Sequence, residues 1–361
     1  MTTPLAVALL GYGWVAERVH TRVLMGLRGV RITAVADTDP ERRKVAAAKT
    51  GAPTFASWEE ALDPERVDAV VISLPPNFHP PAAELALSRG LHVYVEKPIA
   101  ADLCAAAGLV GAWRRSGLVG MVGFNYRFNP LVRALRRQVS TGRVGRVIAV
   151  RSTFSVGASR APGRTGGWRD LPGEGGGALL DLGVHHLDLI PFVLGDPFEA
   201  VLGASDPGGR EESVTAQLRT TGGVTVQCLF SMASVDEDRI DVFGSGGKLG
   251  VARYDSTGPE AGRARGPRGA ARAAVEWAGA LLHPYRFRRH FSPGHEPSYR
   301  PALEAFVAGV RDGRSGSPDL VDGLRALAVV EAVRRSARDG KTVVVAGIAG
   351  PLPGAANEAD P

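Results

Sequence analysis

The chain has 361 residues, 44% of them apolar and 22% charged, a length that suits one large or two ordinary globular domains. No apolar run reaches the 18 or so residues of a membrane span, and the first basic residue is Arg18, so we expect a soluble cytoplasmic protein without a secretory signal. The net charge is +6, and residues 261–290, with seven arginines and one acidic residue, Glu276, carry an excess of the same size. We interpret this segment as a surface lid or insertion and not as a nucleic-acid site.

Short β-type runs alternate with amphipathic stretches in the first third of the chain. We expect strands over residues 5–11, 30–37, 68–75, 91–98 and 118–125. The helices between them carry boundary signals, such as Asp39 as N-cap with Pro40 after it and Gly90 at a C-terminus. Strands regularly separated by helices indicate a parallel, doubly wound sheet, so we predict an α/β fold with an N-terminal Rossmann domain over residues 1–125.

The pattern changes after Asn125, where strands begin to follow one another. Helices are expected over 131–141, around 181–194, and over 301–312 and 321–339, with strands over 144–156, 213–220, 223–232 and 239–254. We predict an α+β domain over residues 126–350, built on a large, mainly antiparallel open sheet, and a disordered tail over 351–361. We expect Val, Leu, Phe and Met on the outer face of this sheet, which would be covered in a homodimer or homotetramer.

The segment Gly11-Tyr12-Gly13-Trp14-Val15-Ala16 directly follows a strand and opens a helix, as in the GxGxxG/A turn that lets a pyrophosphate approach the backbone. Asp37 ends the next strand, where its carboxylate can accept hydrogen bonds from the adenosine ribose and repel a 2′-phosphate. We therefore predict dinucleotide binding over an ordinary glycine turn, and NAD over NADP. Arg42 and Arg43, one helical turn onward, are the cations that could reach such a phosphate.

Glu96-Lys97-Pro98 ends the fourth strand, at the edge where open α/β sheets bind ligands. The chain contains five lysines, and one placed there can stabilise a developing alkoxide, although a surface lysine is the ordinary alternative. The peptide bond before Pro98 is also a candidate for the cis form.

Asp181, His185 and Asp188 have spacings of four and three, so on a helix they share one face, while His186 points elsewhere. A buried helix with satisfied polar groups and a metal site are both open readings of this pattern, but no further His/Cys/Asp cluster supports a metal and we expect none. Cys104 and Cys228 lie in apolar runs and are expected to be free, buried thiols. Gly246-Gly247-Lys248 is expected to form a hairpin turn.

The motifs GYGWVA, VVISLPPNFH, YVEKP, GFNYRFNP and GGWRDLPGEGGGALLDLGVHHLDL, in this order, resemble those of the Gfo/Idh/MocA oxidoreductases, from about Leu5 to Val345. The resemblance implies a nicotinamide cofactor, a polyol or sugar substrate, and oligomer contacts through the C-terminal sheet. It makes Lys97 and His185 the catalytic pair, Asp181 the residue that orients the histidine, and Arg127 and Asp188 substrate contacts beside Lys97. It adds residues that line the cofactor, namely Pro75, Asn77, His79, Glu96, Trp168 and Arg169.

Oxidation of a secondary alcohol needs a base that titrates near neutral pH and a cation beside the oxygen, and His185 and Lys97 supply these two groups. The leading hypothesis is therefore an NAD-dependent dehydrogenase or ketoreductase of a cyclitol, sugar or amino sugar. An NAD-dependent glycosidase that uses transient oxidation and a catalytically silent NAD-binding regulator are the alternatives.

Overall fold

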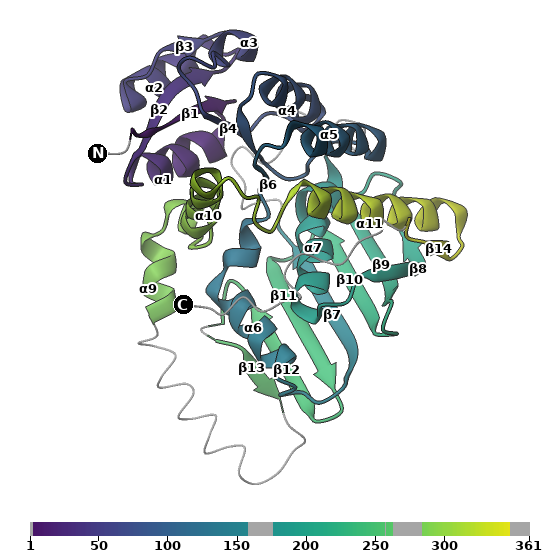
Figure 1. The fold of residues 1–361 in the computed structure, drawn as a ribbon. Helices are drawn as coiled ribbons and strands as arrows, with labels where there is room; N and C mark the ends of the chain where they lie inside the picture. The colour runs from purple at the N-terminus through teal and green to yellow at the C-terminus, as the bar shows by residue number, and fades with distance from the viewer. Residues whose placement is uncertain (1–2, 158–175, 257, 263–283, 347–361) are drawn as a thin grey trace.

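The computed structural model describes residues 3–157, 176–256, 258–262 and 284–346, which form two sheets with helices around them (Figure 1). The first sheet is parallel throughout, with the strand order β3-β2-β1-β4-β5-β6. Its strands are β1 (Leu5–Leu10), β2 (Val30–Ala36), β3 (Thr54–Phe55), β4 (Ala69–Ile72), β5 (His92–Val95) and β6 (Gly120–Val122). The predicted Rossmann arrangement is confirmed. The two-residue β3 was not predicted, because so short a run carries no periodicity.

Helices cover both faces of this sheet. They are η1 (Ala16–His20), α1 (Thr21–Met25), α2 (Pro40–Thr50), α3 (Trp58–Ala61), η2 (Pro76–Phe78), α4 (His79–Ser88) and α5 (Leu103–Ser116). Asp39 caps α2 as predicted, accepting from the amide of Glu41 at 2.8 Å. The prediction of a buried thiol is wrong for Cys104, which is exposed, and right for Cys228. The buried stripe of α5 runs through Ala106, Leu109 and Val110. Cys104 lies two positions before Ala106 and therefore faces away from this stripe.

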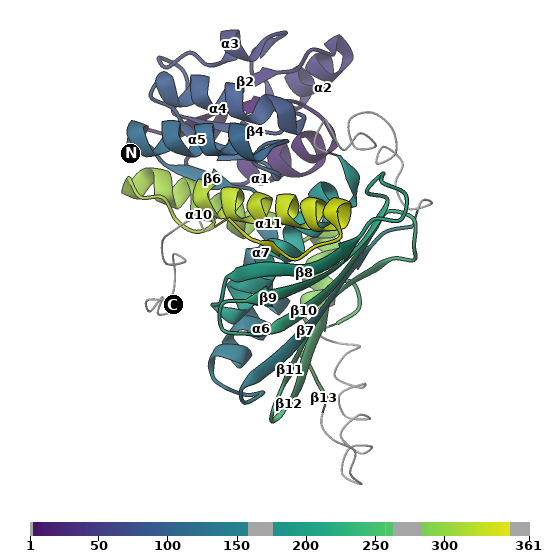
Figure 2. The same ribbon diagram turned by 90° about the vertical axis from the view of Figure 1, so that its right-hand side faces the viewer.

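The second sheet has the order β13-β12-β11-β7-β10-β9-β8-β14 and is antiparallel except where β7 pairs with β10. Its strands are β7 (Val147–Ser155), β8 (Phe198–Ser205), β9 (Ser213–Thr220), β10 (Thr225–Ser231), β11 (Glu237–Gly244), β12 (Gly247–Ala252), β13 (Glu260–Gly262) and β14 (Val343–Val344). The expected mainly antiparallel sheet is confirmed. A hairpin joins β11 and β12 as expected, but its turn is Ser245-Gly246, and Gly247 and Lys248 already belong to β12, where they pair with Gly244 and Phe243. The helices α6 (Pro130–Ser140), α7 (Val184–Leu194) and α11 (Leu320–Asp339) lie on one face of the sheet (Figure 2).

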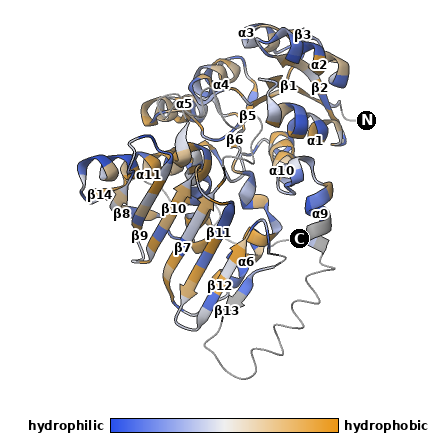
Figure 3. Ribbon diagram, turned by 180° about the vertical axis from the view of Figure 1, so that it is seen from behind, coloured by the Kyte–Doolittle hydropathy of each residue, from blue (hydrophilic) through white to orange (hydrophobic). Residues whose placement is uncertain are grey.

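The other face of this sheet mixes polar and apolar residues (Figure 3). In β9, Val214 and Leu218 are buried, whereas Thr215, Gln217 and Arg219 are exposed. The prediction that the outer face carries Val, Leu, Phe and Met holds for Leu229 of β10, which is 36% exposed and pairs with Thr215. For most of these residues it is wrong, because the two-residue period of a strand turns them toward the helices. The composition of this face therefore does not support a homo-oligomer, which stays a prediction from the family resemblance.

The last described helices connect the two sheets. Ala302, Leu303 and Phe306 of α10 (Tyr299–Asp312) join the core around Leu9 and Tyr94 of the first sheet. The next helix, α11, packs on α5 of the first domain and on α7 and β8 of the second. Among the described residues, no helix combines the length and the apolar character needed to cross a bilayer.

Candidate active site

The turn after β1 has the geometry that a dinucleotide requires. Gly11 adopts a φ of +81°, and a Cβ there would lie 2.6 Å from the carbonyl oxygen of Ser73. A Cβ on Gly13 would meet nothing within 4 Å, so open space lies above the turn. Tyr12 is buried and Trp14 is 57% exposed. The residues present fit a pyrophosphate against the backbone at this turn.

Asp37 lies beside this turn at the end of β2. Its Oδ2 accepts from the amide of Tyr12 at 2.6 Å and its Oδ1 from the amide of Asp39 at 2.9 Å. Arg43 donates to the carbonyls of residues 37 and 38, whereas the half-exposed Arg42 approaches Asp37 Oδ2 at 3.7 Å. The backbone amides hold the carboxylate in place, while each oxygen keeps capacity for a ribose hydroxyl. Arg42 approaches this carboxylate, whereas Arg43 is engaged with the backbone.

Two of the residues expected to line the cofactor are engaged in contacts inside the protein. His79 is buried, with Nδ1 2.7 Å from the carbonyl of Pro98 and Nε2 2.8 Å from that of Leu74. Burial lowers the pKa of His79, and these two carbonyls oppose the shift. Since both ring nitrogens contact the backbone, His79 ties the end of β4 to the Lys97–Pro98 turn. Its contact with the cofactor stays a prediction.

Glu96 is the second of these residues. Its Oε1 lies 2.9 Å from Nε2 of His20, a fully buried residue of η1 that was not predicted as part of the site. Its Oε2 accepts from the amide of Lys97 at 3.2 Å. The sequence feature that points to His20 is its position on the helix that follows the glycine turn. Pro75 and the exposed Asn77 follow β4 at the carboxyl edge, and Trp168 and Arg169 lie outside the described residues.

Lys97 connects the two domains. The Lys97–Pro98 peptide bond is cis. The Nζ atom of Lys97 lies 2.8 Å from the carbonyl oxygen of Asp181 and 3.0 Å from its Oδ1, and both side chains are largely buried. Asp181 belongs to η7 (Leu179–Gly183), which continues directly into α7, so His185 follows one helical turn later. Asp181, predicted to orient the histidine, thus forms an ion pair with the lysine.

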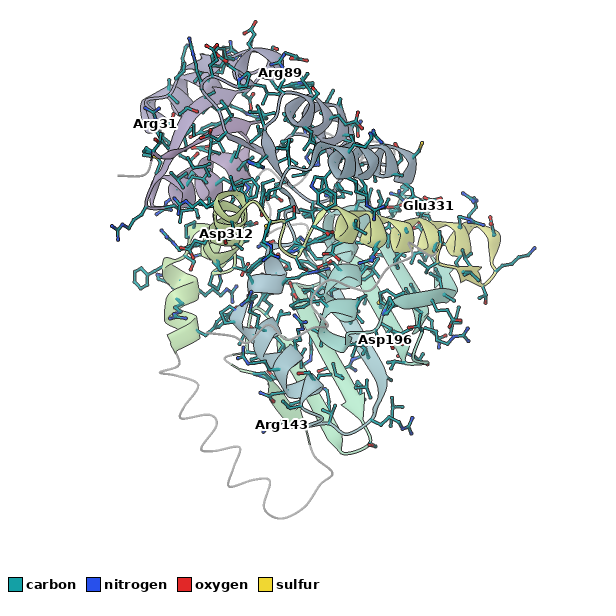
Figure 4. The ribbon with its side chains drawn as sticks, viewed as in Figure 1. Arg31, Arg89, Arg143, Asp196, Asp312 and Glu331 are labelled. Carbon is teal, nitrogen blue, oxygen red and sulfur yellow. The ribbon has the colours of Figure 1, made fainter. Side chains whose placement is uncertain are left out.

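Lys97, Asp181 and His185 are largely buried, unlike the exposed Arg31 and Arg143 at the edge of the molecule (Figure 4). The imidazole of His185 is 6% exposed and stacks on the ring of Tyr126 in η3 (Asn125–Phe128), with centroids 4.2 Å apart and planes inclined by 23°. The rings of Phe124 and Phe154 lie 6.4 and 6.2 Å away. Aromatic rings therefore enclose the imidazole of His185, which lies one helical turn after the aspartate that pairs with Lys97.

Arg127 and Asp188, expected as substrate contacts, are paired with each other. Nε of Arg127 donates to Oδ2 of Asp188 at 2.8 Å, its second nitrogen binds Oδ1, and its third lies 3.1 Å from Oδ2 of Asp322 in α11. All three residues are buried. The guanidinium uses both oxygens of Asp188, so this buried pair connects η3, α7 and α11. The contact of Arg127 and Asp188 with substrate stays a prediction.

Burial raises the pKa of Asp188 to about 6, although Arg127 opposes the shift. An Asp in an unfolded chain titrates near 4, so this carboxyl favours folding below about pH 4 and loses that contribution as the pH rises through about 6.

We expect Arg127→Met to lower the free energy of unfolding by roughly 3–5 kcal/mol at pH 8, because it leaves Asp188 and Asp322 buried without this cation. The loss should be smaller at pH 5.5, where the folded variant can protonate Asp188. Urea unfolding at both pH values measures it, with the exposed Arg338→Met as control. Equal losses at the two pH values would contradict this account.

No group of three or more His, Cys, Asp or Glu side chains within the described ranges could hold a metal ion, so a metal site on Asp181, His185 and Asp188 has no support there.

Comparisons with known proteins agree along nearly the whole chain. A family model described as "Oxidoreductase family, NAD-binding Rossmann fold" matches residues 5–124, and one described as "Oxidoreductase family, C-terminal alpha/beta domain" matches residues 136–345. Inositol 2-dehydrogenase of Rhizobium meliloti is 28% identical over 350 residues, covering 94% of this chain and 98% of that protein. The dTDP-3,4-didehydro-2,6-dideoxy-alpha-D-glucose 3-reductase of Actinomadura kijaniata is 28% identical over 340 residues, covering 93% of this chain and 96% of that one.

The fold is also found in the crystal structure of the WlbA dehydrogenase from Bordetella pertussis in complex with NADH and UDP-GlcNAcA. That structure superposes with a TM-score of 0.79 at 22% identity, covering 95% of this chain and 98% of that one.

Proposed function

The chain belongs to the Gfo/Idh/MocA oxidoreductase family, and on this premise we propose that it transfers a hydride between NAD and a secondary alcohol or ketone carbon of a cyclitol, sugar or amino sugar. The names of relatives that align over nearly their full length support this substrate class, since one acts on inositol and another on a nucleotide-linked deoxysugar.

One observation carries the proposal. The ammonium of Lys97, at the carboxyl edge of the Rossmann sheet, contacts Asp181 of the other domain at 2.8 and 3.0 Å, one turn before His185. A cation and an imidazole are thereby held near each other at the edge where a Rossmann sheet binds its nucleotide. These are the two groups that interconversion of an alcohol and a ketone requires.

In this proposal NAD supplies the hydride acceptor for oxidation, and NADH the donor for reduction. Lys97 donates a hydrogen bond to the substrate oxygen and stabilises the negative charge that develops on it. Nδ1 of His185 is buried. We therefore assign Nε2 to the substrate hydroxyl, from which it takes the proton in oxidation and to which it returns the proton in reduction. Asp181 holds the lysine ammonium between the two domains.

Absorbance at 340 nm with NAD and a panel of inositols, aldoses, amino sugars and nucleotide sugars tests the proposal. A dehydrogenase forms one NADH for each alcohol oxidised. Release of a leaving group without net NADH would favour the glycosidase. Binding of NAD without turnover of any panel member, in either direction, would favour the silent regulator.

The position of Asp37 leads to a prediction for cofactor choice. We expect wild type to bind NAD more tightly than NADP, and Asp37→Ala to weaken NAD binding by about 10- to 100-fold, the size of a lost charge-assisted hydrogen bond. Binding of NADP should fall less, because the variant no longer repels the 2′-phosphate and retains Arg42. Fluorescence titration with both nucleotides measures this.

The matched control is Asp68→Ala, which removes a carboxylate that accepts from the amide of Ala6 at the opposite edge of the same sheet. Tighter binding of NADP than of NAD by wild type would contradict the role given to Asp37.

A further inference from the structure

Two adjacent histidines of α7 are linked to one buried arginine. His185 stacks on Tyr126. The hydroxyl of Tyr126 accepts from Arg253 at 2.8 Å, and the guanidinium carbon of Arg253 lies 3.7 Å from the centroid of the tyrosine ring. His186 reaches the same arginine through Asp238, whose Oδ1 lies 3.1 Å from the histidine Nε2. The arginine therefore stands behind the ring that contacts the proposed base.

Arg253 is itself firmly held. Its Nε donates to Oδ2 of Asp238 at 2.8 Å, and another of its nitrogens pairs with Glu296. All three residues are no more than 6% exposed. Burial acts to raise the pKa of Asp238, but Arg253 and His186 hold it below its ordinary value. A buried arginine that pairs with two acidic side chains has little rotational freedom, so it presents a fixed planar surface to the ring of Tyr126.

Glu296 also holds the backbone next to Tyr126. Its Oε1 accepts from the side-chain amide of Asn129 at 3.0 Å and from the backbone amide of Ser298 at 3.1 Å. Asn129 follows η3 directly, so the carboxylate that holds Arg253 also fixes the segment that carries Tyr126. The ring is thus restrained both from its own backbone and through its hydroxyl.

We propose that Tyr126, supported by Arg253, is a positioning residue that sets the plane of the His185 imidazole. This inference rests on the proposed function, in which His185 is the base. A base acts efficiently only when its nitrogen is held within hydrogen-bond reach of the proton that it accepts. A stacked ring restricts rotation of the imidazole about its χ angles without occupying either ring nitrogen, and so it leaves proton transfer free.

Three variants separate the parts of this support. Tyr126→Leu removes the ring, and we expect kcat to fall roughly tenfold, the size of a lost stacked aromatic contact, while KM for NAD stays within about twofold. Tyr126→Phe keeps the ring and loses only the hydrogen bond to Arg253, so it should retain kcat within about threefold. Arg253→Lys keeps a cation between Asp238 and Glu296 but loses the planar group over the ring, and its kcat should fall between those of the other two.

The control is Phe198→Leu, which removes a buried ring from β8 of the same domain and should leave kcat unchanged. The kinetic substrate is the panel member that wild type turns over fastest. NMR of protein labelled at histidine gives a second readout that needs no substrate. In wild type and Tyr126→Phe the ring protons of His185 should be shifted upfield by the stacked ring, and in Tyr126→Leu this shift should be lost.

The outcomes distinguish this inference from the proposed function. Wild-type turnover in His185→Ala would remove the base itself, and the inference with it. Impaired turnover in His185→Ala together with wild-type kcat in Tyr126→Leu would overturn the positioning role alone. An unchanged His185 spectrum in Tyr126→Leu would show that the rings are not stacked in solution, which also overturns it. Wild-type kcat in Arg253→Lys would show that Arg253 does not contribute to the positioning of His185.

Discussion

We expect His185→Ala to lower kcat by about 10²- to 10⁴-fold, the range for loss of a positioned general base. The dissociation constant of NAD should stay nearly unchanged, because the imidazole lies on α7 of the second domain, away from the glycine turn. Raising the pH should restore part of the rate, since hydroxide can then take the substrate proton. Steady-state kcat against pH, with NAD titration by fluorescence, measures both effects.

His290→Ala is the matched control for this experiment, because His290 is exposed on α9 (Pro284–Phe291) and contacts the ring of His295. It should turn over at the wild-type rate. Asp181→Asn should be less damaging than His185→Ala or comparable to it, because the imidazole remains in place. A His185→Ala enzyme with the wild-type pH profile of kcat would contradict the assignment of the base.

Lys97→Ala is the second large effect that we expect. A cation aimed at developing negative charge in a site with little water contributes roughly 3 to 4 kcal/mol to transition-state stabilisation, so kcat should fall by about 10²- to 10³-fold. NAD affinity should again change little. The control is Lys341→Ala, which removes an exposed lysine near the end of the described chain. The same kinetic and titration experiments apply.

Lys97→Arg extends this test. Arginine keeps the charge, but its planar, wider head group does not reproduce the position of a compact ammonium between Asp181 and the substrate, so we expect it to recover only part of the lost rate. If Lys97→Ala and His185→Ala both kept wild-type turnover on the true substrate, hydride transfer at this site would have to be abandoned.

Elements with local signals could be predicted from the amino-acid sequence. A strand, a tight glycine turn, a helix and an acid at the end of the next strand need only short-range geometry, and the structure has β1, Gly11, η1 and Asp37 in those places. The same holds for the long helices α10 and α11, whose apolar period is visible in the chain. Helical spacing alone also placed Asp181 and His185 on one helix.

Contacts between residues far apart in the chain could not be predicted, because they depend on how the elements pack. Lys97 and Asp181 are 84 positions apart, and Tyr126 and Arg253 are 127 apart. Spacing along the chain carries no information about such pairs. The burial of Arg127 against Asp188 and Asp322 likewise depends on how three elements pack. A charged side chain enclosed by protein must find its partner there, whereas the same side chain at a surface could bind substrate. Packing decides between these roles, because it determines which of the charged groups the solvent can reach.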